Sequence, residues 1–128
     1  MSGMSGLRAG WTPLLRLEGL AVLLLALTLF STLDGSWLLF ALLVLLPDLS
    51  MLGYLGGARV GAITYNAAHT YLGPALLGGA AWWLADPLSG HVALIWTSHI
   101  GLDRLFGFGL KLPTGFGDTH LGSIGKGG

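Results

Sequence analysis

The residues of this chain best suited to chemistry are a histidine and an aspartate four positions apart, His99 and Asp103. Four residues are slightly more than one helical turn, so on a helix the imidazole and the carboxylate lie side by side on one face. Both groups bind divalent metals, and together they supply two ligands of a site. Such a pair also forms a hydrogen bond that holds a helix in place, so the spacing alone leaves both interpretations open.

Three further ionisable side chains lie within long apolar segments: Glu18, Asp48 and His69. They are conspicuous because only 9% of the residues are charged. A polar group in an apolar segment normally faces the protein interior and has a partner there. These residues are therefore candidates to join His99 and Asp103.

The composition is typical of a membrane protein. Hydrophobic residues make up 53% of the chain and the mean hydropathy is +0.75, which leaves too little polar surface to cover a soluble globule. Residues 14–30 and 67–85 form apolar runs close to the roughly 20 residues that a membrane-spanning helix needs. A cleavable signal peptide is the alternative for the first run, but Glu18 inside it and the apolar segments after it argue against that.

Composition also excludes several classes of site. The chain has no cysteine, so disulfides and thiolate metal sites are excluded. Its net charge is zero and its basic residues are scattered, which argues against nucleic acid as a partner.

The apolar runs, caps and turns predict an all-α fold, an integral membrane bundle of four helices. Residues 13–128 form its single domain, and residues 1–12 are expected to be a disordered lead. We expect helices at residues 13–31, 37–54, 62–83 and 91–108. Pro47 should kink the second helix and Gly73-Pro74 should interrupt the third. Residues 109–128 contain too much glycine to be helical.

Glycines elsewhere have two expected uses. Gly53, Gly57 and Gly61 recur every fourth residue at the end of the second helix, and we interpret them as loop-forming. Gly101, Gly107 and Gly109 are expected to allow close contacts between helices.

Lysine and arginine positions predict the orientation in a bilayer. The basic residues flank the first helix, the second turn and the C-terminal end: Arg8, Arg16, Arg59, Arg104, Lys111 and Lys126. The turns around Asp34 and Asp86 have none. The positive-inside rule then places both termini in the cytoplasm of a multi-pass protein of the cell inner membrane.

The polar residues of different helices are expected at a similar depth. At about 1.5 Å per residue, Asp48, His69 and the His99–Asp103 pair lie about 7–14 Å from the cytoplasmic helix ends, with Glu18 at the shallow limit. A divalent metal would let several carboxylates converge without repulsion, and nitrogen and oxygen ligands suit zinc, iron or manganese. The alternative is a hydrogen-bonded network that holds the helices in register.

Five segments of the chain carry a resemblance to a known family. They are Leu17-Glu18-Gly, Pro47-Asp48-Leu-Ser-Met-Leu-Gly-Tyr54, Tyr65-Asn66-Ala-Ala-His69-Thr-Tyr71, His99-Ile-Gly-Leu-Asp103-Arg104 and Pro113-Thr-Gly-Phe-Gly-Asp118-Thr-His120-Leu-Gly122. Over nearly everything after residue 14 the chain resembles an uncharacterised domain-of-unknown-function family of short bacterial four-helix membrane proteins. This resemblance implies the fold and implies no activity.

A more distant resemblance implies an activity. A Pro-Asp pair, then a histidine, then His-x-x-x-Asp is similar to the membrane-bound metal-dependent hydrolases and the helical zinc-dependent phospholipase C fold, where these residues surround bound metal. Asp48, His69, His99 and Asp103 match that order. The chain departs from the hydrolases because Tyr65-Asn-Ala-Ala-His69-Thr replaces their His-Arg-Gly-x-Thr-His pattern, and because no later His-x-x-x-Glu pair follows. The resemblance therefore implies one metal ion rather than several.

The glycine-rich tail carries two more ligand-type side chains, Asp118 and His120. We expect the tail to fold back over the cytoplasmic end of the bundle and bring one of them to the cluster, as a ligand or as a general base. Alternatively Asp118 caps a turn through Thr119 and His120 is solvated. With Glu18, these two residues are the candidate catalytic groups.

Three functions remain open on this reasoning. The first is a metal-dependent hydrolase of a phospho- or acyl-ester at the lipid surface. The second is a non-catalytic membrane subunit or scaffold, and the third is a small ion or proton carrier. The expected partners are membrane lipid and either a membrane-complex partner or a second copy of the chain.

Overall fold

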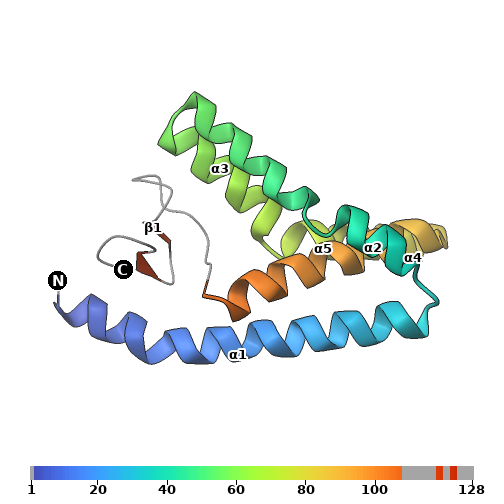
Figure 1. Ribbon diagram of the computed structural model, residues 1–128, viewed down its shortest axis with the longest axis horizontal. Helices are drawn as coiled ribbons and strands as arrows, with labels where there is room; N and C mark the ends of the chain where they lie inside the picture. The colour runs from blue at the N-terminus through green and yellow to red at the C-terminus, as the bar shows by residue number, and fades with distance from the viewer. Residues whose placement is uncertain (1, 108–117, 120–121, 124–128) are drawn as a thin grey trace.

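The structure is a computed structural model that describes residues 2–107, 118–119 and 122–123. It is almost entirely helical, which confirms the all-α expectation (Figure 1). The helices are α1 (Ser2–Thr32), α2 (Trp37–Leu43), the 3-10 helix η1 (Leu46–Gly56), α3 (Ala58–His69), α4 (Leu72–Leu84) and α5 (Pro87–Leu105). In the tail, β1 (Asp118–Thr119) pairs antiparallel with β2 (Gly122–Ser123).

The helices follow one another as four segments, two of which are broken: α2 continues into η1, and α3 into α4. Each break lies upstream of a proline, whose ring clashes with the carbonyl four residues earlier. Accordingly α2 ends at Leu43, four residues before Pro47, and the chain is extended at Thr70, four residues before Pro74 (φ −93°, ψ 154°). The predicted kink is thus a change to 3-10 geometry, and the third helix breaks earlier than at Gly73-Pro74.

Three helix ends differ from the sequence prediction. The backbone is helical from Ser2, so residues 2–12 are not the disordered lead that we expected. The helix passes through Pro13 without a break, although this proline and the glycines before it disfavour a helix. Helix α3 starts at Ala58 because Gly57 turns sharply there, with φ 106°. Helix α5 starts at Pro87, since proline is well suited to the first helical turn.

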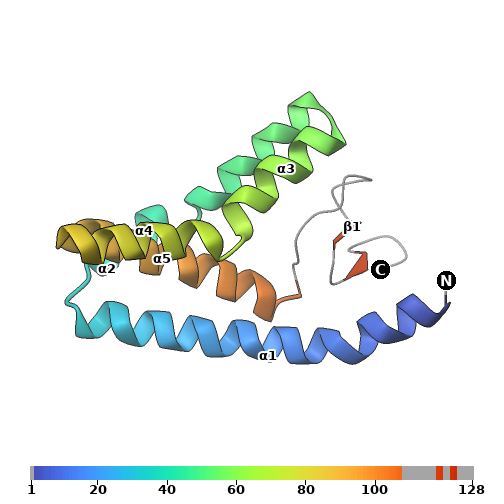
Figure 2. The ribbon, with the colours of Figure 1, turned by 180° about the vertical axis from the view of Figure 1, so that it is seen from behind.

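Helix α5 lies at the centre of the arrangement and contacts α1, α2 and α4. It runs antiparallel to α1, while η1 and α3 pair as a hairpin that diverges from α1 (Figures 1 and 2). The largest fully buried apolar side chains are Phe30 of α1 and Ile95 and Ile100 of α5. The core therefore lies along the contact between α5 and its neighbours.

Glycines set the closest of these contacts. A Cβ atom at Gly19 would lie 2.5 Å from Cβ of Arg104 and 2.8 Å from the Gly101 carbonyl oxygen, so α1 and α5 meet with their backbones nearly touching. This confirms the expectation for Gly101. It is wrong for Gly107, which has nothing within 4 Å of an added Cβ and instead turns the chain after α5 with φ 90°, while Gly109 lies outside the described residues.

Of the three glycines expected to form a loop, only Gly57 does so. Gly53 and Gly61 lie inside η1 and α3, where a Cβ would clash with Thr64 and Tyr54, respectively, across the contact between these helices.

Two stretches are long and apolar enough to cross a membrane, by length and composition: Pro13–Thr32 and Trp37–Gly56. They are barely covered by the rest of the protein, with 17% and 0% of their residues buried. Much large apolar surface is exposed elsewhere too, including Trp82 and Trp83 at the end of α4, which are 83% and 81% exposed. Water would oppose so much apolar exposure, whereas lipid would not.

The glycine contact between α1 and α5 makes a testable prediction. Gly19→Ala should lower the free energy of unfolding by about 1–3 kcal/mol, because the added methyl overpacks the contact. Gly79→Ala in α4 is the matched control: nothing lies within 4 Å of a Cβ there, so the protein should be unchanged or more stable by up to about 1 kcal/mol. Thermal unfolding followed by circular dichroism in one detergent compares them. Equal midpoints would contradict the close contact.

Candidate metal centre

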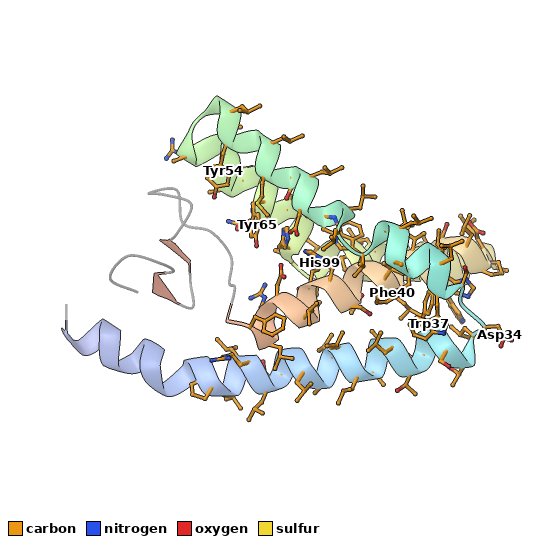
Figure 3. The ribbon with its side chains drawn as sticks, in the orientation of Figure 1. Asp34, Trp37, Phe40, Tyr54, Tyr65 and His99 are labelled. Carbon is orange, nitrogen blue, oxygen red and sulfur yellow. The ribbon has the colours of Figure 1, made fainter. Side chains whose placement is uncertain are left out.

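Four side chains from three helical segments converge near the centre of the molecule. Asp48 lies in the first turn of η1, His69 is the last residue of α3, and His99 and Asp103 lie one turn apart on α5. Figure 3 shows His99 where these segments meet. One ligand atom from each of the four lies within 4.8 Å of the others. The structure thus brings together the four residues that the sequence singled out as metal ligands.

The two histidines face the two carboxylates through the same ring nitrogen, Nε2. His99 Nε2 lies 3.0 Å from Asp48 Oδ1 and 3.2 Å from Asp103 Oδ2. His69 Nε2 lies 3.2 Å and 3.4 Å from the same two oxygens. The two Nε2 atoms are 3.1 Å apart.

The tautomer of His69 is fixed by its own helix. Its Nδ1 lies 2.8 Å from the Tyr65 carbonyl oxygen, which can only accept, so Nδ1 carries the hydrogen. In the neutral ring Nε2 then has a free lone pair. The Tyr65 ring stacks on the imidazole at 3.7 Å between centroids, with 7° between the planes, and fixes the orientation of the ring.

A carbonyl that a proline leaves without a helical donor adjoins His99. The backbone of Val44, whose N–H donates to Phe40, lies close enough to act on the His99 ring. Pro47 has no N–H to offer the Val44 carbonyl, and the Asp48 N–H bonds Leu45 instead. Because Nε2 of His99 faces the carboxylates, this carbonyl is placed to accept from Nδ1.

When both neutral imidazoles carry their hydrogen on Nδ1, the two Nε2 lone pairs and the two carboxylates point at one small volume. Such an arrangement repels itself unless a cation, either a proton or a metal ion, lies among the four atoms. Ligands about 2.0–2.1 Å from a tetrahedral zinc would lie about 3.3 Å apart, and the nitrogen–oxygen and nitrogen–nitrogen distances here are 3.0–3.4 Å. The residues therefore fit a divalent metal in ligand type and in these distances.

The centre is closed on the histidine side and open on the aspartate side. The side chains of His69 and His99 are only 3% and 2% exposed, whereas those of Asp48 and Asp103 are 33% and 19% exposed. A small molecule therefore has access along the Asp48 edge.

The break between α3 and α4 supplies the surrounding contacts. Ending the helix at His69 removes the backbone donors that would otherwise bond the last carbonyls. The Ala68 carbonyl instead accepts from Nε1 of Trp96 at 2.6 Å, and the His69 carbonyl accepts from Nη2 of Arg104 at 3.0 Å. The Arg104 guanidinium also lies over the Tyr71 ring, 5.9 Å from its centroid. Side chains of α5 therefore hold the His69 end of α3 in place.

These supporting contacts were not predicted from the sequence. No such role was expected for Arg104, Trp96 or the Val44 carbonyl. The signals that could have found them are the two prolines, because the helix break before each leaves carbonyls three to six residues upstream without helical donors, and side chains can bond these.

The candidate catalytic residues are not part of this cluster as far as the structure describes them. Glu18 is exposed on α1 and is not among the four convergent side chains. Asp118 begins β1, which Figure 1 labels on the side where α1 and α3 diverge, but its side chain lies outside the described residues. His120 also lies outside them, so the predicted fold-back of the tail onto the cluster stays a prediction.

The remaining histidine, His91, belongs to a different environment. Its Nε2 lies 3.0 Å from the Leu33 carbonyl oxygen, and its ring packs against Phe30 near the start of α5. It is not one of the residues that can share a metal.

Comparison with known proteins places the chain in a family. No curated protein and no solved structure matches it. Residues 12–124 match the family described as "Domain of unknown function (DUF4260)". The match includes α1 from residue 12 onward, all the later helices and all four convergent residues. The chain is therefore a member of the DUF4260 family.

Proposed function

We propose that this protein is a membrane protein with one divalent metal, zinc in the first instance, that hydrolyses a phospho- or acyl-ester at the lipid surface. Asp48, His69, His99 and Asp103 would hold the metal. The observation that carries the proposal is the convergence of two Nε2 atoms and two carboxylate oxygens, with the His69 tautomer set by the Tyr65 carbonyl. Such carbonyl partners are characteristic of metal-binding histidines.

The buried histidines and the more exposed Asp48 have different parts in this proposal. His69 and His99 are buried and rigidly held, so they fix the position of the centre. Asp48 lies at the exposed edge, where a substrate would enter and where its second oxygen could orient a water molecule or accept its proton. When bound, a divalent metal would polarise the ester and lower the pKa of a water molecule. A network held together by protons alone would serve only helix registry.

The exposed apolar surface supports the membrane part of the proposal. Asp34, Trp37 and the end of α4 lie at one end of the molecule, and Tyr54 at the other (Figure 3). The tryptophans Trp37, Trp82 and Trp83 fit an aromatic belt at the first end, while Arg59 follows η1 at the second. We propose a multi-pass inner-membrane protein with its termini on the cytoplasmic, Arg59 side.

Metal content is the first prediction of this proposal. Protein reconstituted with zinc, iron or manganese should retain about one metal ion per chain by mass spectrometry, as expected for a four-ligand site. His99→Ala should lower the affinity in a chelator competition by well over tenfold, since even outer partners of metal ligands are worth about 10- to 100-fold. His91→Ala, outside the cluster, should bind as the wild type does. A folded wild-type protein that retains none of these metals would instead support the scaffold or carrier.

Activity of the loaded protein is the second prediction. A chelator should abolish turnover of p-nitrophenyl phosphate or p-nitrophenyl acetate, and added metal should restore it. If the tail supplies the general base, His120→Ala should lower kcat by about 10²- to 10⁴-fold while metal content stays unchanged. Full turnover in that variant would show that His120 is not the base. A metal-loaded protein inactive on both ester classes would contradict hydrolysis but not metal binding.

Topology gives a third prediction, and the absence of cysteine makes it simple to test. Leu33→Cys and Leu88→Cys each place one cysteine near Asp34 and Asp86, respectively, in the two segments without basic residues. Both positions are exposed. In intact cells a membrane-impermeant maleimide should label both, whereas Arg59→Cys should be labelled only after permeabilisation. Labelling of Arg59→Cys in intact cells would reverse the proposed orientation.

A further inference from the structure

A second feature of the structure adjoins the metal centre: an apolar chamber of about 270 Å³. Side chains of α2, η1, α4 and α5 line it, among them Leu43, Leu46, Leu77, Val92, Ile95 and Trp96. Among the described residues that line it, none is charged. The one polar side-chain atom, Nε1 of Trp96, is already bonded to the Ala68 carbonyl. The chamber therefore suits hydrocarbon and offers nothing to a polar group.

The chamber and the metal centre are built from neighbouring residues. Pro47 and Ala68 line the chamber, and each immediately precedes a ligand, Asp48 and His69. On α5 the chamber residues Val92 and Ile95 precede His99 by seven and four positions, so all three lie on one helix face. A molecule that reaches the centre thus finds an apolar space about one helical turn away.

On α5, a positive charge lies on the other side of the metal ligands from the chamber. Asp103 follows His99 by one turn, and Arg104 is its neighbour and donates to the His69 carbonyl. The order along α5 is therefore apolar chamber, metal ligands, then guanidinium. That order matches an amphiphile whose anionic group reaches the centre and whose hydrocarbon chain points away from Arg104.

We propose that the chamber binds the hydrocarbon chain of the substrate, so that the substrate is a single-chain amphiphile with a phosphate-type head group. This inference rests on the proposed metal-dependent function and specifies its substrate class. The volume selects one chain, because whole ligand pockets span about 300–1,000 Å³ and this chamber lies just below that range. The rest of the molecule would stay in the surrounding lipid.

The test uses the full-length protein in lipid nanodiscs, loaded with Co²⁺. Cobalt absorption reports on the metal's ligands, so it detects a phosphate group that reaches the centre. The probes are ethyl, butyl and octyl phosphate. Affinity should rise with chain length by up to about fourfold for each methylene that enters the chamber. Partition of the probes into the bilayer also raises the apparent affinity, but equally for every variant.

Two substitutions fill the chamber from different helices, Leu77→Phe on α4 and Val92→Phe on α5. The matched control is Leu76→Phe, the same change at the adjacent position, which is 67% exposed and points away from the chamber. Cobalt content and the ethyl phosphate affinity of each variant show whether the centre is intact. If one filled variant loses cobalt, the other decides.

The proposal expects the filled variants to bind ethyl phosphate as the control does and to lose at least tenfold in octyl phosphate affinity relative to the control. Equal octyl phosphate affinity in filled and control variants would overturn the chamber assignment and leave the metal site standing. Failure of the wild type to take up cobalt would instead overturn the proposed function. A chain-length effect that disappears in Leu76→Phe as well would also refute the chamber, because that position lies outside it.

Discussion

Two prolines impose the constraint on which the centre depends. Neither Pro47 nor Pro74 can donate a backbone hydrogen bond, and each breaks the helix about one turn upstream. The carbonyls that lose helical donors must be bonded in another way. The Ala68 carbonyl accepts from Trp96 and the His69 carbonyl accepts from Arg104, while the backbone of Val44 adjoins the His99 ring. All three side chains belong to α5, so both broken segments are held against the same helix.

That arrangement determines the electrostatics of the cluster. Because the Tyr65 carbonyl accepts from Nδ1 of His69, the Nε2 lone pair of that ring points at the carboxylates of Asp48 and Asp103. The energetic need for a cation therefore arises from backbone geometry as well as from the ligands themselves. Burial strengthens that need at the two histidines, whose side chains are only 3% and 2% exposed and cannot turn to water.

The sequence by itself determined the all-α class of the fold and the four residues of the metal-ligand cluster. Apolar run lengths predicted four helical segments, and Pro47 and Pro74 marked the two broken ones, because the ring of a proline inside a helix crowds the carbonyl four residues earlier. A proline alone does not decide the break, since α1 continues through Pro13. The His99–Asp103 pair followed from helical periodicity. Asp48 and His69 could be added because a charged group in an apolar segment is costly without a partner. Helix ends were less well predicted, most of all the helical start of α1 at Ser2.

Only the tertiary structure decided how these residues face one another. The Tyr65 carbonyl decides which ring nitrogen of His69 points inward, and the His99 ring lies beside the backbone of Val44, 55 residues away in sequence and beyond any local pattern. The contact of Gly19 with Gly101 and the apolar chamber likewise require segments distant in sequence to pack together. Periodicity and composition describe one segment at a time, whereas tautomers, contacts and cavities are set by how several segments pack.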